Sequence, residues 1–217
     1  YEKHEENSIK SIQSLATEVK LDVIDSPMQH VAMKVGFAEG DKSMAGFAEV
    51  VLDASLEDSV VEDFMSYSRK RHKEFYQKDF GGILRDEHQY NNHCYILRSV
   101  HDIGVPGFKH REFMVKSIWK RIDADCIISA YEPFDAWDKD FPIPPADDAV
   151  RATSWALMTF RKLDAVGGIP QTKMTLITHL DLSGVVPISS VNKRLPARLG
   201  NLELRRLQFD KSLEIDS

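Results

Sequence analysis

Residues 111–122 read REFMVKSIWKRI, a run with the length and composition of a long β-strand. Successive side chains of a strand point to opposite faces, so the odd-numbered residues of this run share one face. They are Phe113, Val115, Ser117, Trp119 and Arg121. The run therefore predicts a strand that turns this face toward a core.

The segments around this strand have the same period. Strand-like runs cover 84–91, 93–102, 125–133, 149–162 and 172–182, with turn-forming residues at most junctions. Six strands in succession imply an antiparallel sheet. Farther upstream, the apolar segments 30–38 and 44–53 lie on either side of a Glu-Gly-Asp-Lys turn, which favours a hairpin.

Helical spacing occurs in three places. Apolar residues recur at this spacing in a helix of about 5–20, and Ser55 is a typical N-cap for a second helix that extends to about Lys78. The last 30 residues predict a long third helix, in which Pro196 either introduces a kink or marks the first turn. Its apolar stripe consists of Val191, Leu195, Leu199, Leu202, Phe209 and Leu213.

This order of elements predicts an α+β fold, in which a large curved antiparallel sheet has its concave face closed by the long C-terminal helix. The 217 residues fit one domain, 1–217, with a core of about 30–213. A chain of this size buries about 70 % of its unfolded surface and needs no disulfide or structural metal. A sheet closed by a helix can enclose a cavity for a small apolar ligand.

Composition excludes several classes of protein. No apolar run exceeds four residues, against roughly 20 for a membrane span. The net charge of −6 argues against general nucleic-acid binding. Cys94 and Cys126 lie in apolar surroundings typical of free core cysteines, so we expect a cytoplasmic protein. The sequence begins at Tyr1 without Met, so other domains of a longer parent chain are conceivable partners.

Several motifs, in this order, resemble those of START (steroidogenic acute regulatory protein-related lipid-transfer) domains. The stretch 111–114 resembles the family's R-D-F-V, and 150–152 its V-R-A. Asp181, Gly184 and Pro187 are similar to its D-x-x-G-x-x-P, which is followed here by Val-Asn, and 52–55 resembles a strand-to-helix junction. The resemblance implies a START-type helix-grip fold that holds one lipid in a hydrophobic tunnel without a cofactor.

Two positions depart from the pattern of sterol-carrying members. The arginine expected six residues after Arg111 is replaced by Ser117, and the position of its acidic partner holds Arg98. A buried arginine can bind a phosphate or carboxylate with two hydrogen bonds, so we expect Arg98 to favour an anionic lipid, a fatty acid or phospholipid, over a sterol. The alternatives for Arg98 are a salt bridge to Glu87 or Glu132 on a neighbouring strand, or a position on an exposed edge.

The expected ligand-binding residues come from the two central strands and the C-terminal helix. They are Ile96, Arg98, Phe113, Val115, Ser117, Trp119, Leu195, Leu199 and Leu202. The loop after the 93–102 strand carries Ile103, Val105 and Phe108, which we expect either to dock on a membrane or to fold onto the core. The basic run 69–73 and five basic residues within 188–209 are further candidates for transient, peripheral membrane contact.

Signals for catalysis are weak. His88 and His93 lack a third ligand at metal spacing, and there is no phosphate-binding glycine loop, G-x-S-x-G or C-x-x-C motif. We therefore expect no enzyme and no metal. The leading hypothesis is a lipid carrier or transfer domain. The alternatives are a lipid-sensing regulatory or adaptor module, and a helix-grip cyclase or hydrolase.

Overall fold

The computed structural model describes residues 1–37, 43–65, 81–104, 107–134, 148–184 and 186–216. The helices are α1 (Lys3–Glu18), α2 (Leu56–Met65), α4 (Ile188–Leu199), α5 (Leu202–Gln208) and α6 (Ser212–Ile215). The strands are β1 (Lys20–Ile24), β2 (Ala32–Phe37), β3 (Met44–Leu52), β4 (Gly82–Asn91), β5 (Cys94–His101), β6 (His110–Asp123), β7 (Cys126–Pro133), β8 (Ala149–Val166) and β9 (Ile169–Asp181).

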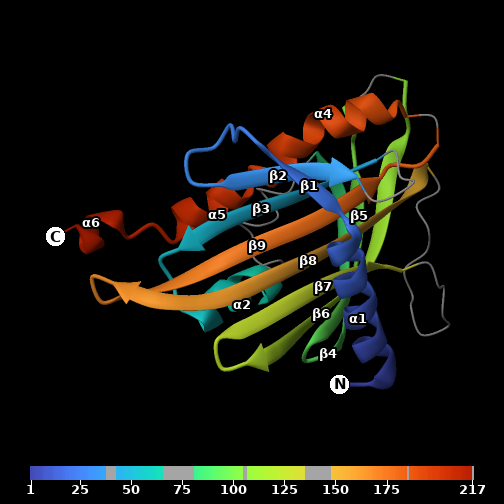
Figure 1. The fold of residues 1–217 in the computed structure, drawn as a ribbon. Helices are drawn as coiled ribbons and strands as arrows, with labels where there is room; N and C mark the ends of the chain where they lie inside the picture. Colours follow the sequence, from blue (N-terminus) through green and yellow to red (C-terminus); the bar gives the residue numbers. More distant parts are fainter. Residues whose placement is uncertain (38–42, 66–80, 105–106, 135–147, 185, 217) are drawn as a thin grey trace.

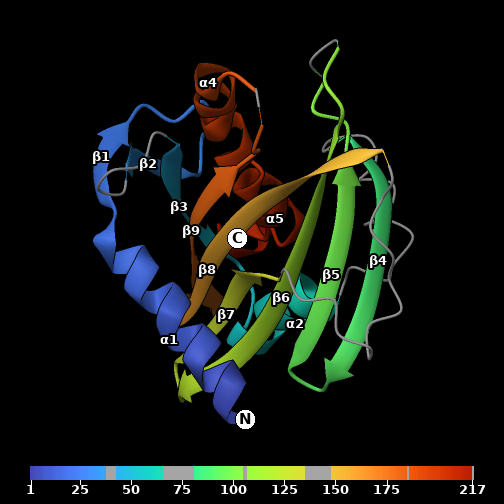
Figure 2. The ribbon, with the colours of Figure 1, turned by 90° about the vertical axis from the view of Figure 1, so that its right-hand side faces the viewer.

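These nine strands form one curved sheet in the order β1-β2-β3-β9-β8-β7-β6-β5-β4. Neighbours are antiparallel, with one additional parallel pairing between the starts of β6 and β8. Figure 1 and Figure 2 show the sheet curving around α4 and α5, while α1 crosses its outer, convex face. The α+β helix-grip prediction is confirmed, and the sheet does not close into a barrel.

The convex face is covered by α1. Ile9 and Ile12 of this helix are buried in a cluster with Ile118 of β6 and Ile128 of β7. The helix begins with a capping box, in which the Glu5 carboxylate accepts a hydrogen bond from the Glu2 backbone amide at 2.8 Å. The observed bounds differ by two residues at each end from the expected helix of about 5–20.

The concave face holds the main core. Buried side chains of β2, β3 and β9 pack there against Leu195 and Leu199 of α4 and Leu202 of α5. Gly46 of β3 allows α4 to approach closely, because a Cβ at this position would lie 2.8 Å from Leu199 Cδ1. Leu195, Leu199, Leu202 and Phe209 of the predicted stripe therefore pack on the sheet, whereas Leu213 is 88% exposed and the side chain of Val191 lies outside the described ones.

The C-terminal segment covers the concave face as expected, but as three consecutive helices rather than one. The segment is divided into α4, α5 and α6, and the first break lies at Gly200 and Asn201 rather than at Pro196, which stays inside α4. At Gly200 the chain passes close to Met28, where a Cβ would lie 3.0 Å from Met28 Cε. A side chain there would crowd this contact.

Three further boundaries differ from the expectations. Strand β1 was not predicted, because it alternates only over Lys-Leu-Asp-Val and none of its five residues is buried. Strands β8 and β9 extend past the predicted runs toward the Gly167-Gly168 turn, where both glycines have positive φ. The predicted continuation of the second helix to Lys78 and the linker 133–148 lie largely outside the described residues.

Candidate functional site

A cavity of about 1030 Å³ lies between the concave face of the sheet and the helices α4 and α5. Its volume is at the upper end of the range typical of ligand pockets, about 300–1,000 Å³. The sheet contributes apolar side chains to it: Met44, Leu97, Phe113, Val115, Ala156, Met158, Met174, Leu176, Leu180. Leu204 and Leu207 of α5 also line it and are 41% and 56% exposed, so the cavity reaches solvent along this helix.

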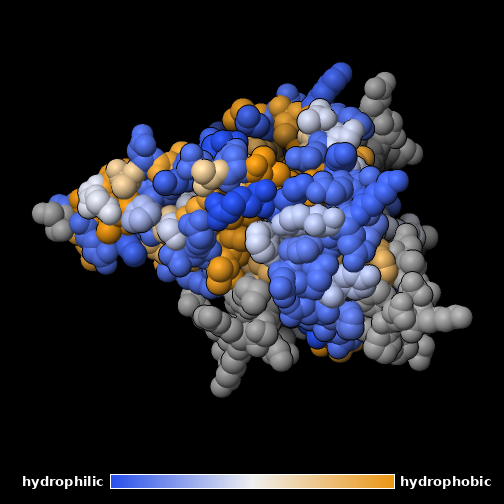
Figure 3. Space-filling view, turned by 90° about the horizontal axis from the view of Figure 1, so that it is seen from below, coloured by the Kyte–Doolittle hydropathy of each residue, from blue (hydrophilic) through white to orange (hydrophobic). Residues whose placement is uncertain are grey.

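Strand pairing explains why so many apolar side chains meet in the cavity. Met158 of β8 lies opposite Leu176 of β9, and Phe160 lies opposite Met174, so cross-strand neighbours present one apolar surface. Figure 3 views the molecule from below and shows hydrophobic side chains gathered in the middle of that face, with hydrophilic ones on either side. The arrangement can hold an apolar molecule out of water.

Most polar groups on the sheet side of the cavity are bonded within the protein. The hydroxyls of Ser154 and Thr178 donate to the backbone carbonyls of His179 and Trp155, at 3.1 and 3.0 Å. The Asp102 carboxylate accepts a hydrogen bond from the Gly104 backbone amide at 2.7 Å. These groups therefore have less capacity to bind a ligand.

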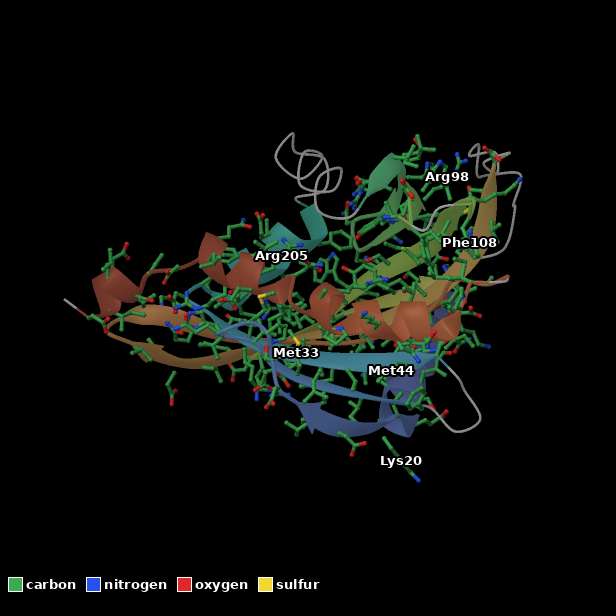
Figure 4. The ribbon with its side chains drawn as sticks, turned by 90° about the horizontal axis from the view of Figure 1, so that it is seen from above. Lys20, Met33, Met44, Arg98, Phe108 and Arg205 are labelled. Atoms are coloured by element: carbon green, nitrogen blue, oxygen red, sulfur yellow. The ribbon has the colours of Figure 1, made fainter. Side chains whose placement is uncertain are left out.

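One end of the cavity is closed by a network between α2, α5 and β7. The Tyr131 hydroxyl donates to the Asp63 carboxylate at 2.8 Å, and the Arg205 guanidinium lies 3.4 Å from the same carboxylate. Figure 4 shows Arg205 on α5, close to α2. Asp63 is 1% exposed, so the network is shielded from water.

Four of the expected ligand-binding residues line the cavity: Phe113, Val115, Leu195 and Leu202. Leu199 lies beside them but packs on Gly46. Ser117 and Trp119 are on the expected face of β6 but are not among the cavity-lining residues. The Phe64 ring of α2 lies 6.2 Å from that of Trp119, so the helix covers this part of the strand.

Arg98 and Ile96 lie on the opposite, convex side of the sheet, and their expected place in the cavity is wrong. Arg98 Nε donates to Glu112 Oε1 at 2.6 Å, and its Nη1 lies 3.3 Å from Asp86 Oδ2. Figure 4 shows Arg98 directed away from α4 and α5. Ile96 packs against Met114 on that side. Strand alternation instead turns Leu97 and Ser99 of β5 inward.

The three residues of the expected docking loop lie in different environments. Ile103 is 9% exposed and lines the cavity, so it is not an exposed tip. Val105 lies outside the described residues, and Phe108 is half-buried. The basic run 69–73 also lies outside them.

The basic residues of the C-terminal segment do not share one surface. Arg205 pairs with Asp63, and Arg206 lies 2.8 Å from Asp53. Lys193 is exposed, whereas Arg198 lines the cavity. The side chain of the fifth, Arg194, lies outside the described ones.

The sequence reasoning missed the contribution of β8 and β9. Met158, Met174 and Leu176 line the cavity, and alternation along these strands could have identified them. It also missed Arg198, which has no sequence signal beyond its place on the polar side of the C-terminal stripe.

Within the described ranges, no helix is long and apolar enough to cross a bilayer. The same part of the chain contains no group of three or more potential metal ligands.

Comparison with solved structures identifies the fold. The human StAR-related lipid transfer protein 5 superimposes with a TM-score of 0.71 and 15% identity, over 98% of this chain and 95% of that one. The human StarD13 lipid transfer and protein localization domain gives a TM-score of 0.66 and 13% identity, over 97% and 99%. A STAR-related lipid transfer protein from Xanthomonas axonopodis gives 0.66 and 16%, over 88% and 98%.

The chain has a START-like fold. No protein-family model matches the sequence, and no curated protein matches it significantly. The likeness therefore lies in the architecture of the START-like fold, at identities of 13–16%.

Within the START-like fold, the motif residue Arg111 binds backbone carbonyls and does not line the cavity. It is 2% exposed and donates to the carbonyls of Leu182 and Lys109 at 2.6 and 2.5 Å. Burial lowers the pKa of its guanidinium. Arg111 thus joins the start of β6 to the turn between β9 and α4.

Proposed function

We propose that this protein binds one lipid in the cavity and carries it between membranes. The observation that supports this most directly is the volume of about 1030 Å³, lined mainly by apolar side chains and covered by α4 and α5. Apolar ligands gain free energy in proportion to the apolar area they remove from water. The similarity to structures named as lipid transfer proteins supports the same proposal.

We further propose an anionic lipid, either a fatty acid or a phospholipid. Three arginines line the cavity, Arg85, Arg198 and Arg205, whereas Asp102 is the one carboxylate among the described lining residues. Arg85 and Arg205 pair with Glu87 and Asp63, so Arg198 is the lining arginine left to favour a ligand that carries a negative charge. Arg98 makes no contribution, because it lies on the convex face.

Exchange of the lipid requires the C-terminal helices to move away from the sheet at a membrane surface. The loop that carries Phe108 is the proposed docking element, because Phe108 is half-buried beside the exposed Lys109. Lys109 could contact anionic headgroups, and Phe108 could insert beside them. The two cysteines are free and buried, which fits the cytoplasm.

The test combines two measurements on one preparation. Native mass spectrometry of the purified protein should detect one bound lipid, and the protein should then move that lipid between labelled donor and acceptor vesicles. A retained lipid that does not transfer would instead favour a lipid sensor. Absence of any bound lipid, even after incubation with vesicles, would contradict the proposal and favour an adaptor.

The same experiment examines catalysis. We propose binding without chemical conversion, since the polar groups of the sheet wall are bonded within the protein. Mass spectrometry of the lipid before and after incubation should give the same mass. A changed mass would support the cyclase or hydrolase alternative.

A further inference from the structure

Three polar side chains of the cavity differ from the others. Arg198, Asn201 and Gln208 line it from the C-terminal helices and are half-buried. Arg85 and Arg205, the other lining arginines, pair with Glu87 at 2.8 Å and with Asp63 at 3.4 Å. No side-chain hydrogen bond or ion pair is formed by Arg198, Asn201 or Gln208 within the described part of the chain.

These three residues form one stripe on the helices. Residues three apart in a helix share a face, which relates Arg198 to Asn201. The break at Gly200 and Asn201 does not interrupt this relation, because both residues keep right-handed helical φ and ψ. The stripe lies beside Leu195 and Leu202, which also line the cavity. A ligand in the cavity would therefore meet polar and apolar groups side by side.

Arg198 is the charged member of the stripe. Burial lowers the pKa of its guanidinium, although arginine remains protonated at any physiological pH. A half-buried cation without a counter-charge is costly, and an anion bound beside it would offset that cost. The planar guanidinium can donate two parallel hydrogen bonds to a carboxylate or a phosphate.

We propose that Arg198 binds the anionic headgroup of the lipid, a carboxylate or a phosphate, and thereby sets the preference for anionic ligands. The inference rests on the proposed lipid-binding function. Asn201 and Gln208 supply additional donors along the same stripe. The apolar tail then lies over the wall formed by Met158, Met174 and Leu176.

The test compares two ligands that share one hydrocarbon chain and differ in charge, oleate and oleyl alcohol. Binding of each to the whole protein is measured by isothermal titration calorimetry, below the concentration at which the ligand aggregates. We expect Arg198→Gln to weaken oleate binding roughly 10- to 100-fold, the range for a hydrogen bond to a charged group. Binding of oleyl alcohol should stay nearly unchanged.

Two more variants sharpen the result. Lys193→Gln removes the same charge from an exposed position on the same helix and should leave the affinity for both ligands unchanged. Arg198→Lys keeps the charge but loses the planar pair of donors, so it should weaken oleate binding less than Arg198→Gln does. It also provides the test if Arg198→Gln fails to fold.

The outcomes separate this inference from the proposed function. Equal losses for oleate and oleyl alcohol, or an unchanged affinity for oleate, would overturn the role of Arg198 and leave lipid binding intact. Failure of the unmodified protein to bind oleate, oleyl alcohol and 1-oleoyl-lysophosphatidic acid would overturn both. A third ligand, 1-oleoyl-lysophosphatidic acid, identifies the headgroup: tighter binding than oleate, lost in Arg198→Gln, assigns a phosphate, and weaker binding assigns a carboxylate.

Discussion

The Arg111 guanidinium, at the start of β6, donates through Nε to the Leu182 carbonyl at 2.6 Å, although the two residues are 71 positions apart in the chain. The contact secures the turn that leads into α4. This turn holds two unusual residues, since Ser183 and Gly184 have φ of 55° and 71°. Left-handed backbone of this kind is favourable for glycine and costly for serine, so the turn needs support from its surroundings.

Arg111→Met should therefore destabilise the protein by about 3 kcal/mol, because the carbonyls of Leu182 and Lys109 lose a charged donor. Urea unfolding measures the loss. Hydrogen exchange should additionally show faster opening of α4. The matched control is Arg161→Met, at an exposed position of β8. A change in stability equal to that of the control would show that the contact contributes nothing.

A second prediction concerns the pair of Arg98 and Glu112, whose side chains are 7% and 3% exposed. Removal of one partner from a buried ion pair costs about 3–5 kcal/mol, because the other charge stays buried. Glu112 also lies 3.0 Å from Arg151, which moderates the loss. Arg98→Leu should cost about 3 kcal/mol in urea unfolding and leave the relative affinity for oleate and oleyl alcohol unchanged.

The double variant Arg98→Leu with Glu112→Leu supplies the control. It should cost less than the two single variants added together, because the pair couples by about 1 kcal/mol or more. A selective loss of oleate binding in Arg98→Leu, with stability unchanged, would restore Arg98 as the ligand anchor.

Strands β5 and β6 show which parts of the candidate site can be predicted from the sequence. The period of two places Phe113 and Val115 on the inner face of β6, and the structure confirms that placement. The same period assigns residues of β5 to two faces but does not say which face is inside. Arg98 was assigned to the cavity, whereas the odd-numbered Leu97 and Ser99 line it.

The sequence could not predict that Arg198 faces the cavity, for a different reason. Whether a helical residue faces a cavity depends on the angle at which the helix crosses the sheet, and this angle follows from long-range contacts such as Gly46 with Leu199. Ser117 and Trp119 were assigned to the correct face but do not line the cavity, and Phe64 of α2 packs against Trp119. Such coverage is decided by tertiary packing rather than by local pattern.

A third prediction follows from Glu5, at the start of α1. Burial raises the pKa of its carboxyl group, but hydrogen bonds from Asn91, His93 and the Glu2 backbone outweigh burial and lower the pKa from 4.5 to about 2. A carboxyl group whose pKa is lower in the folded protein stabilises the fold above the unfolded pKa. That contribution is lost as the pH falls from about 4.5 toward 2.

Between pH 6 and pH 3 the loss from Glu5 amounts to about 2 kcal/mol of unfolding free energy. Glu5→Gln should be less stable than the unmodified protein at pH 6. Between pH 6 and pH 3 it should lose about 2 kcal/mol less unfolding free energy than the unmodified protein does. Urea unfolding at several pH values measures both slopes. The control is Glu18→Gln, at an exposed position in the last turn of α1. Parallel stability curves for Glu5→Gln and the unmodified protein would contradict the assignment.

The last prediction concerns the contact that seats α4 on the sheet. A Cβ on Gly46 would lie 2.8 and 3.0 Å from the two methyl carbons of Leu199 and 3.2 Å from Leu195 Cδ1. Leu199 is fully buried, so its methyl groups have little room to move. Gly46→Ala should cost about 1–3 kcal/mol through overpacking, and Leu199→Ala about 2–5 kcal/mol through the space it leaves.

In the double variant the new methyl group enters that space, so the combined cost should be smaller than the sum by about 1 kcal/mol or more. Gly46→Ala combined with Ile12→Val, on the convex face, should instead be additive, because the two sites share no contacts. Additive costs for Gly46 and Leu199 in urea unfolding would mean that α4 does not rest on β3 at this point.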